Sequence, residues 1–229
     1  MFLLKNWILR SISLLDKSGD FLYLFNRLLR RVVIPNSSMS GSNLSEYLST
    51  TAMNKNVLEF GCGGSTLLFA TNSRQVTSVE SDRYFSNAVF SQILALKQQD
   101  RVRVFWANIG PTKSYGQPWR FTSWIFSRRY SNYSLAVFDE FEDLKNVDMV
   151  FVDGRFRVAC VMSSLLMIEN DFILVIDDYF DRPYYHVVTE ILGNPKSKVD
   201  NTSVFEINRS VLDFIAIENC LKLHLNEPR

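Results

Sequence analysis

Cysteine and histidine are scarce in this sequence, with three cysteines and two histidines among 229 residues. The cysteines, Cys62, Cys160 and Cys220, lie far apart, and the sequence contains no CxxC pair or Cys/His cluster. The chain therefore offers neither the ligand set of a structural zinc site nor a framework of paired disulfides. This cysteine usage favours a reducing compartment, so we expect a cytoplasmic protein.

An excess of charge of either sign is also absent. Lysine and arginine total 25, aspartate and glutamate total 24, and the formal net charge is +1. The composition therefore gives no electrostatic reason to expect nucleic acid as a partner. With 47% hydrophobic and 21% charged residues the chain is typical of a folded globular protein. Its length suits one α/β domain with a short additional segment.

No unbroken apolar run is long enough for a membrane-spanning helix, because charged residues interrupt the hydrophobic N-terminus. That segment also lacks the basic start and small-residue cleavage site of a signal peptide. Apolar residues at helical spacing predict two helices within residues 1–35, so we interpret residues 1–40 as a helical extension and linker that packs on the main domain. The alternative is a peripheral membrane contact, with Arg27, Arg30 and Arg31 at the lipid headgroups.

Strand and helix patterns alternate through residues 41–229, which we interpret as one domain. Because such alternation requires crossover connections, it predicts a mostly parallel sheet with helices on both faces. Residues 204–207 and 211–217 are predicted to be two further strands with no helix between them. We therefore expect an α/β fold whose seven-stranded sheet ends in a C-terminal antiparallel hairpin. Residues 109–147 are interpreted as an irregular, aromatic insertion on the substrate side, with an ordered part expected near residues 135–141.

A glycine-rich loop gives the strongest functional signal. The segment 57–66, VLEFGCGGST, follows a predicted strand and opens a predicted helix, the context of a nucleotide-binding loop. Glycine lets the backbone turn sharply and lets a ligand approach closely. Glu80 ends the next predicted strand, 19 positions after Gly61, where a carboxylate suits hydrogen bonds from ribose hydroxyls.

The residues around this loop favour S-adenosylmethionine as the ligand. A dinucleotide fingerprint would place a small third residue at Thr66, which is β-branched, and the Glu59 carboxylate would repel a phosphate at the helix N-terminus. S-adenosylmethionine has no phosphate and presents an ammonium and a sulfonium, which an anion stabilises. A nicotinamide or flavin dinucleotide, and a glycine turn without any ligand, are the alternatives.

At these residues the chain resembles class I S-adenosylmethionine-dependent methyltransferases, which carry an E/D-x-G-x-G loop followed by an acidic residue at the end of the second strand. The likeness covers about residues 54–217 and implies the Rossmann-like methyltransferase fold. The chain more closely resembles an uncharacterised bacterial-type group of small methyltransferase-like proteins with the motifs EFGxGGST, SVESD, IGPT, VDGRFRVAC and DYxDRPxY. Here these motifs occupy residues 59–66, 78–82, 109–112, 152–160 and 178–185.

The loop, the acid and the flanking motifs assign a set of cofactor contacts. The set comprises Glu59, Gly61, Cys62, Gly63, Gly64, Ser65, Thr66, Glu80, Ser81, Asn108 and Ile109. Asn108 departs from the group, which often has an acidic residue before IGPT. Its amide can still hydrogen-bond an adenine edge, but the lost charge predicts weaker cofactor binding.

Candidate catalytic residues follow the fourth and fifth predicted strands, where open α/β sheets bind ligands. Methyl transfer to an oxygen usually needs a base, and Asp153, Asp178 and His186 are the candidates. The alternatives are a rim of salt bridges between these aspartates and nearby arginines, and a merely packing role for His186. Arg155 and Arg157 suit either a clamp for an anionic acceptor or ion pairs beside the helix.

Two further predictions concern metal and activity. Asp153, Asp177 and Asp178 resemble the acidic residues of catechol O-methyltransferase-like enzymes and are weak candidates for holding a divalent metal, which the partial match does not favour. The favoured function is O-methylation of a small molecule or a sugar. The alternative is a protein that binds the cofactor, is catalytically silent and mediates assembly. The sequence indicates no oligomeric state.

Overall fold

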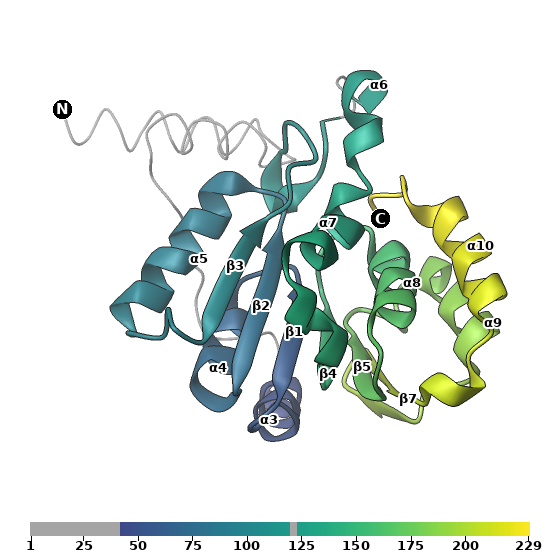
Figure 1. Cartoon of the computed structure of the whole chain (residues 1–229), viewed down its shortest axis with the longest axis horizontal. Coiled ribbons are helices and arrows are strands. Elements are labelled where there is room, and N and C mark those ends of the chain that lie inside the picture. The colour runs from purple at the N-terminus through teal and green to yellow at the C-terminus, as the bar shows by residue number, and fades with distance from the viewer. Residues whose placement is uncertain (1–41, 120–122) are drawn as a thin grey trace.

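The computed structural model describes residues 42–119 and 123–229 (Figure 1). The predicted helical extension at residues 1–40, with its proposed membrane contact, lies outside the described residues. Within the two described ranges, no helix combines the length and the apolar character needed to cross a bilayer.

The centre of the molecule is one seven-stranded sheet with the order β3-β2-β1-β4-β5-β7-β6. Neighbours among β1 to β5 pair in parallel, whereas β7 is antiparallel to both β5 and β6. The strands are β1 Asn56–Phe60, β2 Gln75–Glu80, β3 Val102–Trp106, β4 Met149–Val152, β5 Phe172–Ile176, β6 Ser197–Val199 and β7 Thr202–Ile207. This topology confirms the predicted Rossmann-like α/β fold and its antiparallel C-terminal hairpin.

Helices cover both faces of the sheet (Figure 1). One face carries α3 Ser42–Thr51, α4 Gly64–Asn72 and α5 Arg83–Ala95, and the other carries α7 Asn132–Glu140, α8 Arg157–Met167, α9 Val187–Leu192 and α10 Phe214–His224. The short helices are η1 Ser114–Gly116, α6 Ser123–Phe126, η3 Ser127–Arg129, η4 Glu142–Asn146, η5 Pro183–Tyr185 and η6 Arg209–Val211. Within the segment 109–147, the part near residues 135–141 that was expected to be ordered lies mostly in α7, and η4 follows it.

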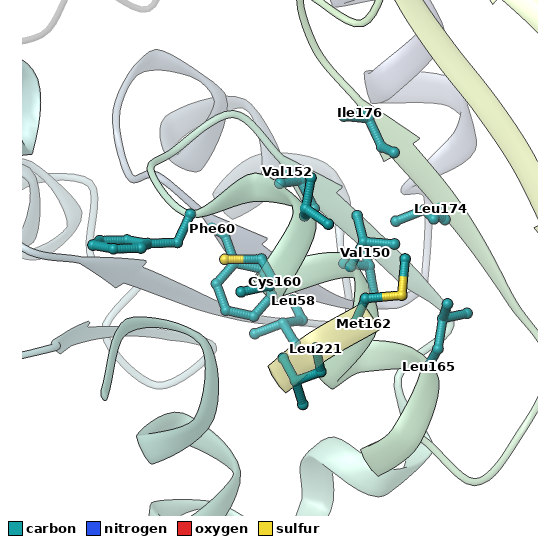
Figure 2. Close-up of a cluster of buried hydrophobic side chains, with 14 of the residues drawn as sticks. Leu58, Phe60, Val150, Val152, Cys160, Met162, Leu165, Leu174, Ile176 and Leu221 are labelled. Atoms are coloured by element: carbon teal, nitrogen blue, oxygen red, sulfur yellow. The ribbon is translucent and has the colours of Figure 1, made fainter. Parts of the chain in front are cut away.

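Alternate strand residues build two separate cores, because successive side chains of a strand point to opposite faces. Figure 2 shows the larger core, where side chains of three neighbouring strands face helices α8 and α10. Its central members are Leu58, Val150, Leu174, Met162, Leu165 and Leu221. The intervening residues Val57, Phe151 and Val175 enter the second core under α3 and α4. This two-sided burial explains why the central strands are nearly continuous apolar runs.

The C-terminal hairpin is not formed by the residues that the sequence suggested. Residues 211–217 were expected to be a strand, but α10 begins at Phe214, with Asp213 as its N-cap accepting hydrogen bonds from two backbone N–H groups. Ile217 and Leu221, four residues apart, are buried against α8. Residues 211–217 were therefore wrongly assigned the two-residue period of a strand, whereas the residues from Phe214 on follow the period of a helix. The partner of β7 is instead β6, a three-residue edge strand whose exposed polar side chains give almost no strand signal.

Candidate functional site

The carboxyl ends of the parallel strands meet at one edge of the sheet, and the loops that follow them form the candidate site. The glycine loop follows β1, Glu80 ends β2, Asp153 follows β4, and Asp177 and Asp178 follow β5. Ligands of open α/β sheets bind in this position because the strand order reverses beside β1. The structure thus brings the glycine loop, Glu80 and the three aspartates to one edge of the sheet.

Gly61 is required by both its backbone conformation and its surroundings. Its φ of +103° lies in the region that disfavours side chains, and an added Cβ would lie 2.6 Å from the backbone nitrogen of Gly154. Gly154, in the loop after β4, is itself crowded by the hydroxyl of Tyr133. The two glycines therefore let the β1 and β4 loops touch. The sequence singled out Gly61 but not the structural role of Gly154.

A side chain would have room at Gly63, whereas it would clash at Gly61. Its φ of 170° is ordinary extended backbone, and an added Cβ would meet nothing within 4 Å. Its backbone N–H donates to the Thr66 hydroxyl at 2.8 Å, which fixes the turn into α4. The loop is therefore rigid on one side and accessible on the other, as a cradle for a ligand must be.

The buried Glu59 side chain supports the glycine loop through hydrogen bonds. Its carboxylate has no exposed surface and accepts hydrogen bonds from the hydroxyls of Ser65, Thr66 and Ser78. Desolvation by burial raises the pKa of Glu59 to about 7, although the three hydroxyls oppose this rise. The sequence placed Glu59 beside the positive charge of a ligand. The structure shows a positioning role through Thr66, whose hydroxyl also accepts a hydrogen bond from the Gly63 N–H, and a contact of Glu59 with a ligand stays a prediction.

Glu80 faces the glycine loop. Its Oε1 accepts hydrogen bonds from the Asp82 N–H at 2.8 Å and the Ser81 hydroxyl at 3.1 Å, whereas its Oε2 lies 3.8 Å from the Cys62 sulfur. A thiol is a weak donor, so Oε2 retains acceptor capacity for stronger donors such as hydroxyls. Burial raises the pKa of Glu80. Burial and the nearby Glu80 charge raise the pKa of the Cys62 thiol well above its usual value, so Cys62 is not an activated nucleophile.

A loop between β3 and α6 lies against Glu80. Thr112 and Pro118 form a β-bridge at its base, and Gly116 at its tip has a φ of +66°. The Gly116 carbonyl accepts a hydrogen bond from the Ser81 hydroxyl at 3.0 Å, and an added Cβ would lie 3.0 Å from Glu80 Oε1. Sequence reasoning missed this contact, which joins the insertion to the end of β2.

The predicted adenine-flanking residues have structural partners of their own. The Asn108 side-chain oxygen accepts a hydrogen bond from the Gly110 N–H at 3.1 Å, and the Asn132 amide donates to the Asn108 carbonyl at 3.1 Å. Ile109 is completely buried in the larger core. Both residues shape the start of the insertion, and their contact with an adenine stays a prediction.

Three aspartates gather at the ends of β4 and β5, around a buried arginine. Asp153, Asp177 and Asp178 each offer one oxygen, and these oxygens lie within 4.8 Å of one another. Arg157, only 3% exposed, places its Nη2 at 2.9 Å from Asp153 Oδ1 and 3.4 Å from Asp178 Oδ2. Arg182 Nη2 lies 2.6 Å from the same Asp178 oxygen. The structure thus forms the alternative predicted from the sequence, an ion-paired rim.

The divalent metal considered from the sequence does not fit this cluster well. The guanidinium of Arg157 lies between Asp153 and Asp178, and its N–H groups also bond the backbone carbonyls of Asp153, Gly154 and Asp177. Asp177 Oδ1 accepts a hydrogen bond from the Thr202 hydroxyl at 2.6 Å. A buried cation with five hydrogen bonds therefore already pairs with two of the three carboxylates that a metal would need.

The protonation of Asp153 is perturbed by its surroundings. Desolvation, opposed by Arg157 and reinforced by the carboxylates of Asp177 and Asp178, raises the pKa of Asp153 to about 7. A carboxylate with a pKa near the working pH is well matched to accept a proton from a hydroxyl. This pKa is compatible with the general-base role predicted from the sequence, and that role stays a prediction.

His186 is the third predicted catalytic residue, and its contacts lie elsewhere. Its ring packs on Tyr179 with centroids 4.9 Å apart, and its Nε2 lies 3.2 Å from the Tyr179 carbonyl oxygen. No contact between described residues connects His186 to Asp153 or Asp178. Its observed surroundings are those of the packing alternative.

Comparison with known proteins identifies the family. A methyltransferase-like protein from Silicibacter pomeroyi is 31% identical, with a TM-score of 0.73, and the match covers 85% of this chain and 99% of that chain. The fold and the glycine loop with its acid define a Rossmann-like methyltransferase domain. The chain belongs to the family of methyltransferase-like proteins.

More distant structures are also similar. A cofactor-bound protein from MTB is 16% identical, with a TM-score of 0.47, and the match covers 93% of this chain and 83% of that chain. A putative O-methyltransferase from Klebsiella pneumoniae is 16% identical, with a TM-score of 0.47 and coverages of 96% and 84%. No protein-family model matches the chain, and no curated protein matches it. The narrower resemblance to the uncharacterised bacterial-type group stays a prediction.

Proposed function

We propose that this protein is an S-adenosylmethionine-dependent methyltransferase that methylates a hydroxyl of a small molecule or sugar. The observation that carries the proposal is the Glu80 carboxylate, which faces a glycine loop that is open at Gly63. An acceptor of ribose hydroxyls and a cradle without side chains are the two features that a nucleoside-binding loop needs. Membership of the methyltransferase-like family supports the same choice.

The residues around the loop fit this cofactor. Glu80 would accept hydrogen bonds from ribose hydroxyls, and the backbone at Gly63 allows close approach because no side chain projects there. Glu59 and Thr66 hold the loop in place. When bound, S-adenosylmethionine supplies a methyl group on a sulfonium, which departs as a neutral thioether.

Asp153 is proposed to take the proton of the acceptor hydroxyl. With a pKa of about 7 it is partly ionised at neutral pH, and general-base catalysis contributes roughly 10²- to 10⁴-fold. Arg157 keeps one carboxylate oxygen of Asp153 fixed at 2.9 Å. Because Arg157 already pairs with two of the three carboxylates that a metal would need, we propose that transfer needs no divalent metal. Asp178, ion-paired with Arg157 and Arg182, then keeps these cations in place.

A labelled methyl donor tests the proposal when the protein is incubated with a small-molecule extract and with model hydroxyl compounds. We expect a labelled product, a loss of at least about 100-fold in Asp153→Asn, and no loss in Asp139→Asn, an exposed control on α7. The rate should rise with pH through about 7, since Asp153 must lose its proton. A chelator should leave the rate unchanged.

Two outcomes would count against the proposal. Equal labelling by the wild type and Asp153→Asn would remove Asp153 from the mechanism, and inhibition by a chelator that added Mg²⁺ reverses would restore the metal alternative. A protein that binds the cofactor but labels nothing would match the silent binding protein considered from the sequence.

A further inference from the structure

The loop after β4 carries an arginine that neither the ion-paired rim nor the proposed chemistry uses. Arg155 lies two residues after Asp153, and its Nε donates a hydrogen bond to the Tyr115 carbonyl at 2.9 Å. Tyr115 precedes Gly116, which lies against Ser81 and Glu80. The Arg155 side chain therefore reaches from the acceptor side of the site to the loop that lies over the proposed ribose-binding carboxylate.

The charges around Arg155 are unbalanced. Arg157 and Arg182 are paired with Asp153 and Asp178. Arg155, by contrast, has no ion pair with any described carboxylate, and among the described residues its Nη1 and Nη2 have no hydrogen-bond partner. Burial, together with the positive charges of Arg157 and Arg182, lowers the pKa of Arg155. A partly buried cation without a counter-ion is unfavourable, so an anion that reached it would be stabilised.

The geometry of a guanidinium defines what it would bind. The contact through Nε holds the plane of the group, and the two amino groups that remain suit the paired oxygens of a carboxylate or a phosphate. Lysine, with a single ammonium, would reproduce the charge but not this planar pairing.

We propose that Arg155 binds a carboxylate or phosphate group of a ligand between the acceptor and cofactor sides of the site. The inference rests on the proposed function and narrows the ligand class. Two sources of the anion share this chemistry: the amino-acid carboxylate of the methyl donor, and an acidic group on the acceptor.

Calorimetry with two nucleosides tests whether the anion is the amino-acid carboxylate of the methyl donor. S-adenosylhomocysteine carries the amino-acid carboxylate, whereas 5′-methylthioadenosine lacks the amino-acid portion. The wild type is compared with Arg155→Gln, which removes the charge but keeps an N–H donor for the Tyr115 carbonyl, and with Arg155→Lys, which keeps the charge. Arg128→Gln, at an exposed arginine, is the control. Inorganic phosphate titrated into each protein saturated with S-adenosylhomocysteine probes the second source.

If the cofactor supplies the anion, Arg155→Gln should weaken the binding of S-adenosylhomocysteine about 10- to 100-fold, and Arg155→Lys should weaken it less. The binding of 5′-methylthioadenosine should be the same in all the variants. If the acceptor supplies it, S-adenosylhomocysteine should be unaffected and phosphate binding should fall in Arg155→Gln but not in Arg128→Gln. Both results support the proposal and identify the source.

Two results would overturn the proposal. The first is that Arg155→Gln binds all three ligands as tightly as the wild type. The second is that Arg155→Gln binds both nucleosides more weakly by the same factor, which would assign Arg155 to the loop structure alone. Failure of the wild type to bind either nucleoside would instead contradict the proposed cofactor, so the two failures are distinguishable.

Discussion

Replacing Glu59 with glutamine should make the protein less sensitive to pH. The substitution preserves the size of the side chain, and its amide can serve the same three hydroxyls. The carbonyl oxygen would accept from Thr66 and Ser78, while the amide nitrogen would donate to Ser65. What disappears is the charge that burial opposes.

The expected magnitude follows from the pKa of Glu59, which burial raises from 4.5 to about 7 in the folded protein. Between these values the folded state binds more protons than the unfolded state, so the free energy of unfolding falls as the pH rises. The contribution of Glu59 is fully present below about pH 4.5 and is lost by about pH 7. The shift corresponds to about 3 kcal/mol.

Urea denaturation at pH 5 and pH 8 measures this effect. The wild type should lose up to about 3 kcal/mol more than Glu59→Gln between the two pH values. Asp153 also has a raised pKa of about 7, but it is present in both proteins, so the difference isolates Glu59. Parallel pH profiles for the two proteins would refute the view that the buried Glu59 side chain is protonated below about pH 7.

Two further pairs of substitutions separate neighbouring positions. Gly63→Ala should leave the melting temperature nearly unchanged but weaken the binding of S-adenosylhomocysteine at least about 10-fold in calorimetry. Gly61→Ala should lower the free energy of unfolding by about 2–5 kcal/mol, because the added Cβ has no room. Equal stability of the two variants would contradict the geometry of the loop. Ile217→Ala should cost about 2–5 kcal/mol in urea denaturation and Ile215→Ala less than about 0.5, since only Ile217 is buried. The reverse order would contradict the helical register of α10.

The sheet could be predicted because each central strand is buried on both faces. Apolar runs such as residues 149–152 and 172–176 have few other interpretations, and the helices between them require parallel pairing. The period of a short apolar run is harder to determine. Residues 211–217 resemble a strand until Asp213 is recognised as an N-cap and the spacing of Ile217 and Leu221 is included.

The site could be predicted where backbone and charge patterns are local, as at Gly61 and Glu80. It could not be predicted where contacts join distant segments. The direction of the Glu59 side chain depends on Ser78 in the neighbouring strand, and Gly154 is needed only because the β4 loop touches the β1 loop. The position of Arg157 between two aspartates likewise appears only once β4 and β5 are paired.

The proposed function depends most on Glu80 accepting hydrogen bonds from the ribose of an adenosyl ligand beside the glycine loop. Its most direct test is calorimetric titration of S-adenosylhomocysteine into the wild type, Glu80→Gln and, as a control, Glu140→Gln on the exposed face of α7. We predict binding to the wild type and the control, and a loss of about 10- to 100-fold in Glu80→Gln at an unchanged melting temperature. Equal affinity in all three proteins, or no binding by the wild type, would contradict the claim.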